Sequence, residues 1–291
     1  MATFSEWVAG ARPRTLPLAI APVAVGTAAA TVNASFLPVR AGLAAVVAIA
    51  LQIGVNYAND YSDGVRGTDD ARVGPLRLVA SGTKSPKAVK RAAFAAFGVA
   101  CLAGLVLAEQ TTWWLVAVGA AAVAAGWFYT GGPRPYGYSG FGEVFVFIFF
   151  GLVAVVGSAY VQLGRVTLLA VAAAIPVGLL AVALLVVNNL RDIPGDTVAG
   201  KRTLAVRLGD PSTRALYGAC LLVPFGLVPM LAFVDGGHLG ALIALAALPL
   251  AIAPLRLVVG GAAGSALIAV LAKTAQVQLV FGALLSFGLS R

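Results

Sequence analysis

The chain has 291 residues, of which 60% are hydrophobic and only 11% are charged, and its net charge is +9. Soluble domains carry about a quarter charged residues, so this composition cannot cover a globular surface in water. Apolar runs long enough to cross the ~30 Å core of a bilayer recur along the chain, and they are continuous rather than alternating. The composition therefore predicts an all-α, polytopic membrane protein and excludes a soluble one.

The apolar runs predict about nine membrane-spanning helices. In chain order they lie near residues 15–33, 41–59, 91–108, 112–129, 141–162, 166–189, 212–234, 239–258 and 267–289. A short turn around Glu109 separates the third run from the fourth, so the count is eight to ten. No linker or low-complexity tract interrupts the pattern, and we expect residues 1–291 to form a single transmembrane domain.

The basic residues are distributed unevenly between the two ends of the predicted helices. With the N-terminus in the cytoplasm, sixteen Lys and Arg residues fall inside, three fall outside, and Lys273 lies within the last span. This is the positive-inside bias of membrane proteins, so most of the net charge reflects topology rather than nucleic-acid binding. Abundant Ala, Gly and Arg with few Lys is typical of a GC-rich bacterium. We therefore expect a multi-pass protein of a bacterial cell membrane.

Acidic residues concentrate in two polar segments, which we expect to be cytoplasmic loops near 60–90 and 190–212. Six of the eleven acids lie within residues 60–70 and 192–196 of these segments: Asp60, Asp63, Asp69, Asp70, Asp192 and Asp196. In each segment an Asn precedes an Asp by four residues, as Asn56 precedes Asp60 and Asn188 precedes Asp192. This spacing places the paired side chains on one face of a helix.

The same spacing predicts where the second aspartate of each segment lies. Asp63 should share the helix face of Asn56 and Asp60. Pro194 and Gly195 make continuation of the later helix doubtful, so Asp196 is expected on the first turn of the loop. A third segment, 130–140, is rich in Gly and Pro and predicts a rigid irregular turn.

Carboxylates at a membrane boundary are costly unless they are paired or bind a cation. Two facing clusters are stable if they share hard cations, and all-oxygen ligands suit Mg²⁺, which binds one or two carboxylates together with substrate phosphates. The pattern predicts catalytic and Mg²⁺-binding roles for Asp60, Asp63, Asp192 and Asp196. The alternative is that these acids only cap helices and balance the basic loops.

Cationic and amide side chains near the acids are expected to bind the substrate. Guanidinium and ammonium groups hold phosphate oxygens by charge-assisted hydrogen bonds. The expected substrate-binding residues of these types are Asn56, Asn59, Arg66, Arg72, Arg77, Asn188, Arg191, Lys201 and Arg202. The sequence therefore predicts a diphosphate site at the mouth of an apolar chamber.

Two of these motifs resemble those of a known family. Asn59-Asp60-x-x-Asp63 and Asp192-x-x-x-Asp196, about 130 residues apart, resemble the two aspartate-rich motifs of the UbiA superfamily of intramembrane prenyltransferases. The resemblance implies helices around a central cavity, capped on the cytoplasmic side by the motif-bearing loops. It also implies that the motifs bind Mg²⁺ and the diphosphate of an isoprenoid donor.

Further segments resemble the branch of this superfamily that prenylates 1,4-dihydroxy-2-naphthoate in menaquinone synthesis. They are residues 56–63, 67–70, 72–77, 129–133, 140–143 and 200–209. The resemblance implies transfer from a polyprenyl diphosphate to the ring carbon that bears the carboxylate, with loss of diphosphate and CO₂. One position departs from the pattern, because many relatives have a third aspartate where this chain has Gly67, with Asp69 and Asp70 beyond it.

The implied chemistry needs shelter for an allylic cation. An apolar chamber would exclude the water that quenches it, and aromatic rings such as those of Tyr129 and Tyr136 would stabilise it by cation–π contact. Tyr136 is therefore added to the expected substrate-binding residues.

Three other functions were weighed. A prenyltransferase of the same superfamily acting on 4-hydroxybenzoate or another aromatic acceptor has the same motifs. A CDP-alcohol phosphotransferase needs Ala-Arg where this chain has Gly67 and Thr68. A transporter would place its acids near the bilayer midplane, where this chain is nearly uncharged apart from Lys273. The prenyl chain length and the oligomeric state are left open.

Overall fold

The computed structural model describes residues 3–33, 36–68 and 76–291, which form helices and no β-strand. The α-helices are α1 (Phe4–Ala11), α2 (Pro17–Thr31), α3 (Pro38–Val65), α4 (Pro86–Gln110), α5 (Trp114–Phe128), α6 (Gly142–Val146), α7 (Ala154–Leu163), α8 (Leu168–Val198), α9 (Leu204–Leu231), α10 (Leu248–Val259) and α11 (Ala266–Leu289). The short segments between them are η1 (Pro13–Thr15), η2 (Tyr136–Ser139), η3 (Phe147–Val153), η4 (Val234–Gly236) and η5 (Leu239–Ala247).

The helices have the length and composition of membrane spans. Seven helical segments of the described chain are long and apolar enough to cross a bilayer, and α2 and α5 are shorter apolar helices of 15 residues each. The prediction of an all-α, multi-pass membrane protein is confirmed. The count of about nine is approximate, because two of the expected spans form shorter helices.

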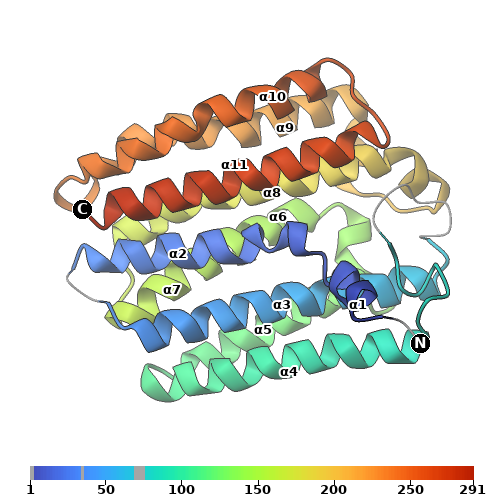
Figure 1. Cartoon of the computed structure of the whole chain (residues 1–291), viewed down its shortest axis with the longest axis horizontal. Helices are drawn as coiled ribbons and strands as arrows, with labels where there is room; N and C mark the ends of the chain where they lie inside the picture. Colours follow the sequence, from blue (N-terminus) through green and yellow to red (C-terminus); the bar gives the residue numbers. More distant parts are fainter. Residues whose placement is uncertain (1–2, 34–35, 69–75) are drawn as a thin grey trace.

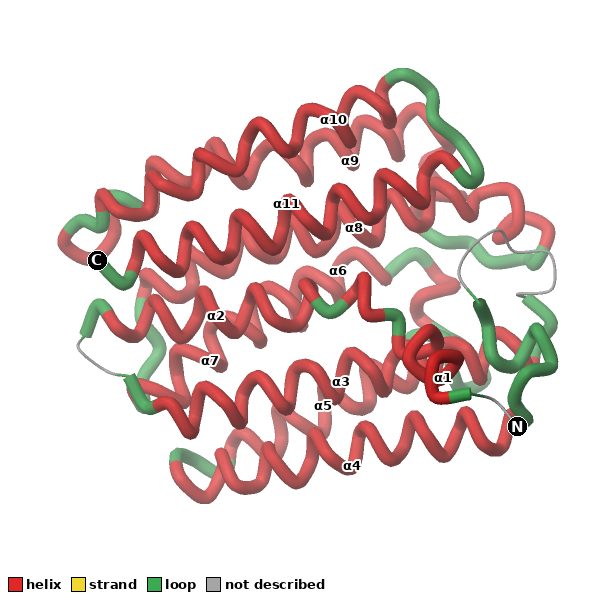
Figure 2. The backbone as a smooth tube through the Cα atoms, viewed as in Figure 1, coloured by secondary structure: helices red, strands yellow, loops and turns green. Residues whose placement is uncertain are grey.

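The long helices lie side by side along the longest axis of the molecule (Figure 1). The most buried is α8, with 72% of its apolar window inside the protein. It packs against α9, α11, α2 and the η3–α7 segment, while α5 packs chiefly on α3 and α4. The C-terminal ends of α3 and α8 lie at the same end of the bundle, on the right in Figure 1 and Figure 2. The two aspartate segments are thereby brought together.

A close helix contact positions one wall of the interior. Gly151 lies against Gly178 of α8 so tightly that a Cβ on Gly151 would come within 2.7 Å of the Cα of Gly178. Small residues allow such close approach between membrane helices. Gly151 belongs to η3, a π-helical segment. A π turn widens the helix and is frequent at functional sites.

The predicted loops are shorter than expected, since the helices on both sides extend into them. α3 continues to Val65 and α8 to Val198, while α9 already begins at Leu204. The expectation that Asp196 lies on a loop turn was wrong, because α8 includes Pro194, Gly195 and Asp196. An interior proline removes one backbone hydrogen bond and bends a helix, but it does not always end it. Asp69, Asp70 and Arg72 lie outside the described residues.

Candidate active site

A long cavity of about 1620 Å³ joins the end of the bundle that carries the aspartates to its far end. Its polar end is lined by Asn59, Asp63, Thr68, Arg77, Asn188, Arg191, Asp192, Asp196 and Lys201. The wall then becomes apolar and reaches Leu107, Leu115 and Val161, which lie close to the opposite ends of α4, α5 and α7. The cavity therefore offers a charged mouth and an apolar channel about as long as the helices.

Four polar residues of α3 form a stripe along this cavity: Gln52, Asn56, Asn59 and Asp63. At 100° per residue they fall within an arc of about 60°. Asp60 lies about 40° beyond Asn56, outside the stripe. It is fully buried, and its two carboxylate oxygens accept the backbone N–H groups of Leu78 at 2.8 Å and Val79 at 3.0 Å.

Asp60 is consequently not among the cavity-lining residues of the described chain. The expectation that it shares the working face of Asn56 and Asp63 is corrected by this geometry. Each spacing of four residues advances a helix by about 40° beyond one full turn, so the two steps from Gln52 through Asn56 to Asp60 rotate Asp60 off the stripe. Its carboxylate anchors the backbone that follows Arg77, and Arg77 itself is buried and lines the cavity.

The two aspartate segments are joined by one ammonium group. The Nζ of Lys201 lies 3.2 Å from Oδ1 of Asp63 on α3 and 3.8 Å from Oδ1 of Asp196 on α8. All three side chains are largely buried at the cavity mouth. A cation is needed here because two buried carboxylates from different helices would otherwise repel each other.

The second segment carries its own ion pair. Arg191 donates from Nε and Nη2 to the two oxygens of Asp192, at 2.7 and 2.8 Å, and from Nη2 to Oδ1 of Asn188 at 2.9 Å. Arg191 is buried and lines the cavity together with its two partners. A fork of this kind holds the guanidinium plane in one orientation at the mouth.

Tyr138 completes the surroundings of Asp63. Its hydroxyl donates to Oδ1 of Asp63, and its ring lies 4.6 Å from the ammonium of Lys201. Burial, with the charge of Asp63, raises the pKa of the Tyr138 phenol well above its ordinary value. Tyr138 therefore stays protonated and remains a hydrogen-bond donor to the carboxylate at any physiological pH.

Several residues expected to bind substrate serve other contacts. Arg66 donates to the carbonyl groups of Thr130 and Gly132, so it holds the 130–140 turn against α3. Arg202 is exposed and is not among the described residues that line the cavity. Asn56 donates to the carbonyl of Ala11 at 2.8 Å, which ties α3 to the last residue of α1.

An aromatic row leads from the mouth into the apolar channel. Tyr129 and Tyr136 pack edge to face at 5.5 Å between centroids, Tyr136 stacks on Phe145 at 4.0 Å, and Phe145 is followed by Phe149 at 6.2 Å. All four side chains line the cavity. Burial raises the pKa of the Tyr136 phenol, so it stays neutral and donates to the carbonyl of Ala125. Of the four, only the tyrosines were expected from the sequence.

The donor set at the mouth fits Mg²⁺. Among the described residues no three His, Cys, Asp or Glu side chains gather closely enough to hold a metal by themselves. Mg²⁺ does not need such a cage, since it usually binds one or two carboxylates and takes its other ligands from water and phosphate. Asp63 and Asp196 meet this requirement, because their oxygens already approach one common cation, the ammonium of Lys201.

Sequence reasoning missed Tyr138, Thr130 and Gln52 as cavity residues. Thr130 donates to Oδ1 of Asn59 at 2.8 Å and so orients that amide. Tyr138 and Thr130 lie in the irregular turn that was recognised only by its glycines and prolines. Gln52 lies four residues before Asn56, about one helical turn earlier, and this spacing of two polar residues was the signal that the sequence offered.

A bundle of apolar helices around a deep cavity, with paired carboxylates and cations at its mouth, defines a membrane-embedded enzyme that handles a diphosphate with an apolar tail. The chain belongs to the UbiA prenyltransferase family, whose profile matches residues 19–272. It is 52% identical over 281 residues to the 1,4-dihydroxy-2-naphthoate octaprenyltransferase of Mycobacterium tuberculosis. The alignment covers 97% of this chain and 95% of that protein.

Two solved structures share the fold. The UbiA homolog from Aeropyrum pernix K1 is 17% identical with a TM-score of 0.70, covering 91% of this chain and 96% of that one. The UbiA homolog from Archaeoglobus fulgidus bound to DMAPP and Mg²⁺ is 18% identical with a TM-score of 0.64, covering 98% of this chain and 99% of that one. The predicted family and the predicted fold are both confirmed.

Proposed function

We propose that this protein transfers a polyprenyl chain from a polyprenyl diphosphate to 1,4-dihydroxy-2-naphthoate, releasing diphosphate and CO₂ in a Mg²⁺-dependent reaction. The observation that carries the proposal is the ammonium of Lys201 between Asp63 and Asp196 at the mouth of a long apolar cavity. The acceptor follows from the name and the 52% identity of the mycobacterial relative. Residues 1–291 would act as one domain.

The charged mouth would bind the diphosphate. Mg²⁺ held by Asp63, Asp192 and Asp196 would neutralise charge on the leaving group. Lys201, Arg191 and Arg77 line the same mouth and would donate to the phosphate oxygens. Asn59 and Asn188 supply further amide oxygens and N–H groups beside the carboxylates. In this proposal Asp60 contributes indirectly, by anchoring the backbone next to Arg77.

The apolar channel would take the prenyl tail. Its wall carries the aliphatic side chains of α3, α4, α5 and α7 down to Leu107, Leu115 and Val161. Because the tail comes from lipid, the apolar wall admits it without desolvating polar groups, and packing against the wall would hold it in the channel. The diphosphate then remains at the mouth, and the first carbon of the tail lies just inside it.

The reacting atoms would meet between the mouth and the aromatic row. As the bond between carbon and diphosphate breaks, positive charge develops on the allylic carbon, and the faces of Tyr136, Phe145 and Phe149 would stabilise it. The cavity wall would keep water from that carbon. The ring attacks through the carbon that bears the carboxylate. As CO₂ leaves, the electron pair of the broken C–CO₂⁻ bond stays with the ring and restores its aromaticity.

We place the site at the cytoplasmic face of a bacterial cell membrane, on the ground that the basic residues collect at this end of the bundle. Anionic diphosphate and aromatic acid would then enter from the compartment in which soluble metabolites are made. The tail would enter from the lipid.

One paired assay tests the function. Membranes containing the protein are incubated with Mg²⁺, a long polyprenyl diphosphate and either 1,4-dihydroxy-2-naphthoate or 4-hydroxybenzoate, and the products are identified by mass. The naphthoate product should lack the carboxylate, with kcat/KM at least ~100-fold above that for the benzoate, because a whole ring is missing from the latter. Equal rates, or a product that keeps the carboxylate, would contradict the proposed acceptor. Failure to release diphosphate would contradict prenyl transfer itself.

A further inference from the structure

A hydrogen-bond network inside the cavity determines how Gln52 is oriented. The hydroxyl of Thr15 donates to the carbonyl of Arg12 at 2.9 Å, and the amide nitrogen of Asn56 donates to the carbonyl of Ala11 at 2.8 Å and to Thr15 Oγ1 at 3.0 Å. Backbone carbonyl groups only accept hydrogen bonds. The Thr15 oxygen is therefore left as an acceptor, and the Asn56 oxygen faces Gln52.

Thr15 Oγ1 and Asn56 Oδ1 both need a hydrogen-bond donor, and only the amide nitrogen of Gln52 can be that donor. Its Nε2 lies 3.0 Å from Thr15 Oγ1 and 3.4 Å from Asn56 Oδ1, contacts that the oxygen end of the amide could not make. The side chain can consequently be assigned in one sense only. Its oxygen, Oε1, must point away from the network.

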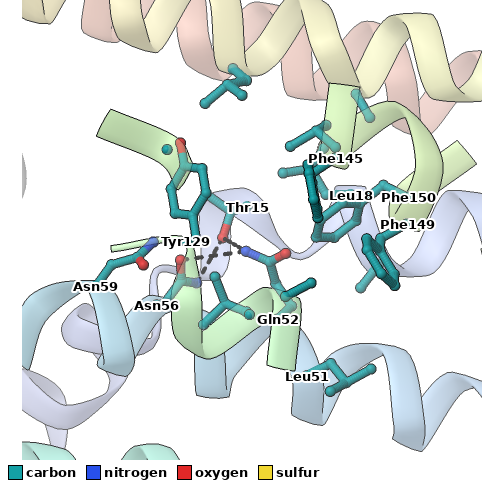
Figure 3. A pocket seen from close by; sticks show the side chains of 18 of the residues that line it. Thr15, Leu18, Leu51, Gln52, Asn56, Asn59, Tyr129, Phe145, Phe149 and Phe150 are labelled. Carbon is teal, nitrogen blue, oxygen red and sulfur yellow. Dashed lines mark hydrogen bonds between the residues drawn. The ribbon is translucent and has the colours of Figure 1, made fainter. Parts of the chain in front are cut away.

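That oxygen has no hydrogen-bond donor among the described residues. Gln52 is only 4% exposed, and it lines the cavity. Figure 3 shows the oxygen turned toward the side of the cavity where Phe145, Phe149 and Phe150 lie. A buried acceptor without a donor is costly, about 1–3 kcal/mol, so such a group in a binding cavity indicates a ligand that brings the donor.

The depth of Gln52 suits the reacting ring rather than the diphosphate. It lies seven residues before Asn59 on α3, which is about 10 Å further along the helix axis. It faces the aromatic row of the channel, beyond the charged mouth. A planar ring whose reacting carbon lies next to the diphosphate would extend to this depth.

The chemistry of the two substrates selects the occupant. A prenyl chain has no hydrogen-bond donor, and an ionised diphosphate offers acceptors only. A hydroxyl on the aromatic acceptor is the donor that remains. Gln52 thus faces a hydroxyl group that only the aromatic acceptor carries.

We propose that Gln52 Oε1 accepts a hydrogen bond from a ring hydroxyl of the aromatic acceptor and so selects hydroxylated rings; this rests on the proposed function. The bond orients the ring between Gln52 and the faces of Phe145 and Phe149. When the hydroxyl is the one next to the reacting carbon, the hydrogen bond also stabilises the positive charge that its oxygen shares as the new C–C bond forms. Gln52 takes no proton, because the electron pair of the C–CO₂⁻ bond returns to the ring as CO₂ leaves.

Ligand binding without turnover tests this role. Affinities for the purified full-length protein are measured with 1,4-dihydroxy-2-naphthoate, 1-hydroxy-2-naphthoate and 4-hydroxy-2-naphthoate, each lacking at most one hydroxyl. Removing the hydroxyl that Gln52 binds should weaken binding to the wild type about ten-fold, equivalent to about 1.4 kcal/mol. In Gln52→Met the same comparison should differ by less than ~2-fold, as a double-mutant cycle requires for a direct contact.

The controls separate a direct contact from a structural effect. Ser158→Ala changes another polar residue of the same cavity wall and should keep the ten-fold discrimination. The KM for the polyprenyl diphosphate should be the same in Gln52→Met and the wild type.

If the wild type and Gln52→Met discriminate equally between the naphthoates, the assignment is overturned. The same result is expected if a water molecule, rather than the ligand, donates to Gln52 Oε1. Equal binding of all three naphthoates to the wild type overturns it without any variant. If the wild type prenylates 1,4-dihydroxy-2-naphthoate while either result holds, only the role of Gln52 is lost. If the wild type neither binds nor prenylates it, the proposed function fails as well.

Discussion

Asp60 and Asp63 belong to one motif, yet their side chains make different contacts. Asp60 is fully buried and accepts two backbone N–H groups, from Leu78 and Val79. Asp63 lines the cavity and contacts Lys201 and Tyr138. Matched isosteric variants, Asp60→Asn and Asp63→Asn, should therefore fail in different ways.

The expected magnitudes follow from these contacts. Asp60→Asn keeps one oxygen for one backbone amide and turns an NH₂ group toward the other. One buried amide donor is then unsatisfied, which should lower the free energy of unfolding by about 1–3 kcal/mol. Asp63→Asn removes a charge that faces the diphosphate site. It should lower kcat by ~100-fold or more, the scale of losing one strong electrostatic contact in a transition state.

Two measurements on each purified variant distinguish the tasks. Denaturant unfolding in detergent reports stability, and the Mg²⁺ concentration that gives half-maximal activity reports the metal site. We expect Asp60→Asn to be less stable with a Mg²⁺ requirement within ~2-fold of the wild type, since the Asp60 carboxylate faces backbone N–H groups and not the cavity. Asp63→Asn should keep the stability of the wild type and require a higher Mg²⁺ concentration for half-maximal activity. A Mg²⁺ requirement shifted as strongly by Asp60→Asn as by Asp63→Asn would refute the assignment and make Asp60 a ligand.

Two further predictions concern the cation at the mouth and the topology. Lys201→Met should lower turnover by ~100-fold or more, because its ammonium bridges Asp63 and Asp196, while Arg202→Met at the exposed neighbouring position should stay within ~3-fold. Comparable losses in steady-state assays of the two variants would contradict the bridging role. Single cysteines at the exposed positions Ser85 and Val198, in a background without Cys101 and Cys220, should react with an impermeant thiol reagent only from the cytoplasmic side. Labelling of intact cells from outside would invert the proposed orientation.

The sequence by itself determined the class of protein and the chemistry of its mouth. Hydrophobic runs of membrane length need no tertiary information to be read, and the all-α, multi-pass class followed from them. The two aspartate segments were also recognisable, because acids are rare in such a chain and their local spacing is visible. Lys201, Arg191 and Arg77 were expected beside them, and all three line the cavity.

Tertiary structure alone decided which side of each helix faces the cavity. Spacing gives the angle between Asn56 and Asp60 about their own helix axis, but not the sector of α3 that the neighbouring segments leave open. The backbone at Leu78 and Val79 occupies the sector of Asp60, and the cavity occupies that of Gln52 and Asp63. Tyr138 and the free oxygen of Gln52 depend likewise on contacts between residues far apart in the chain, which local spacing cannot encode.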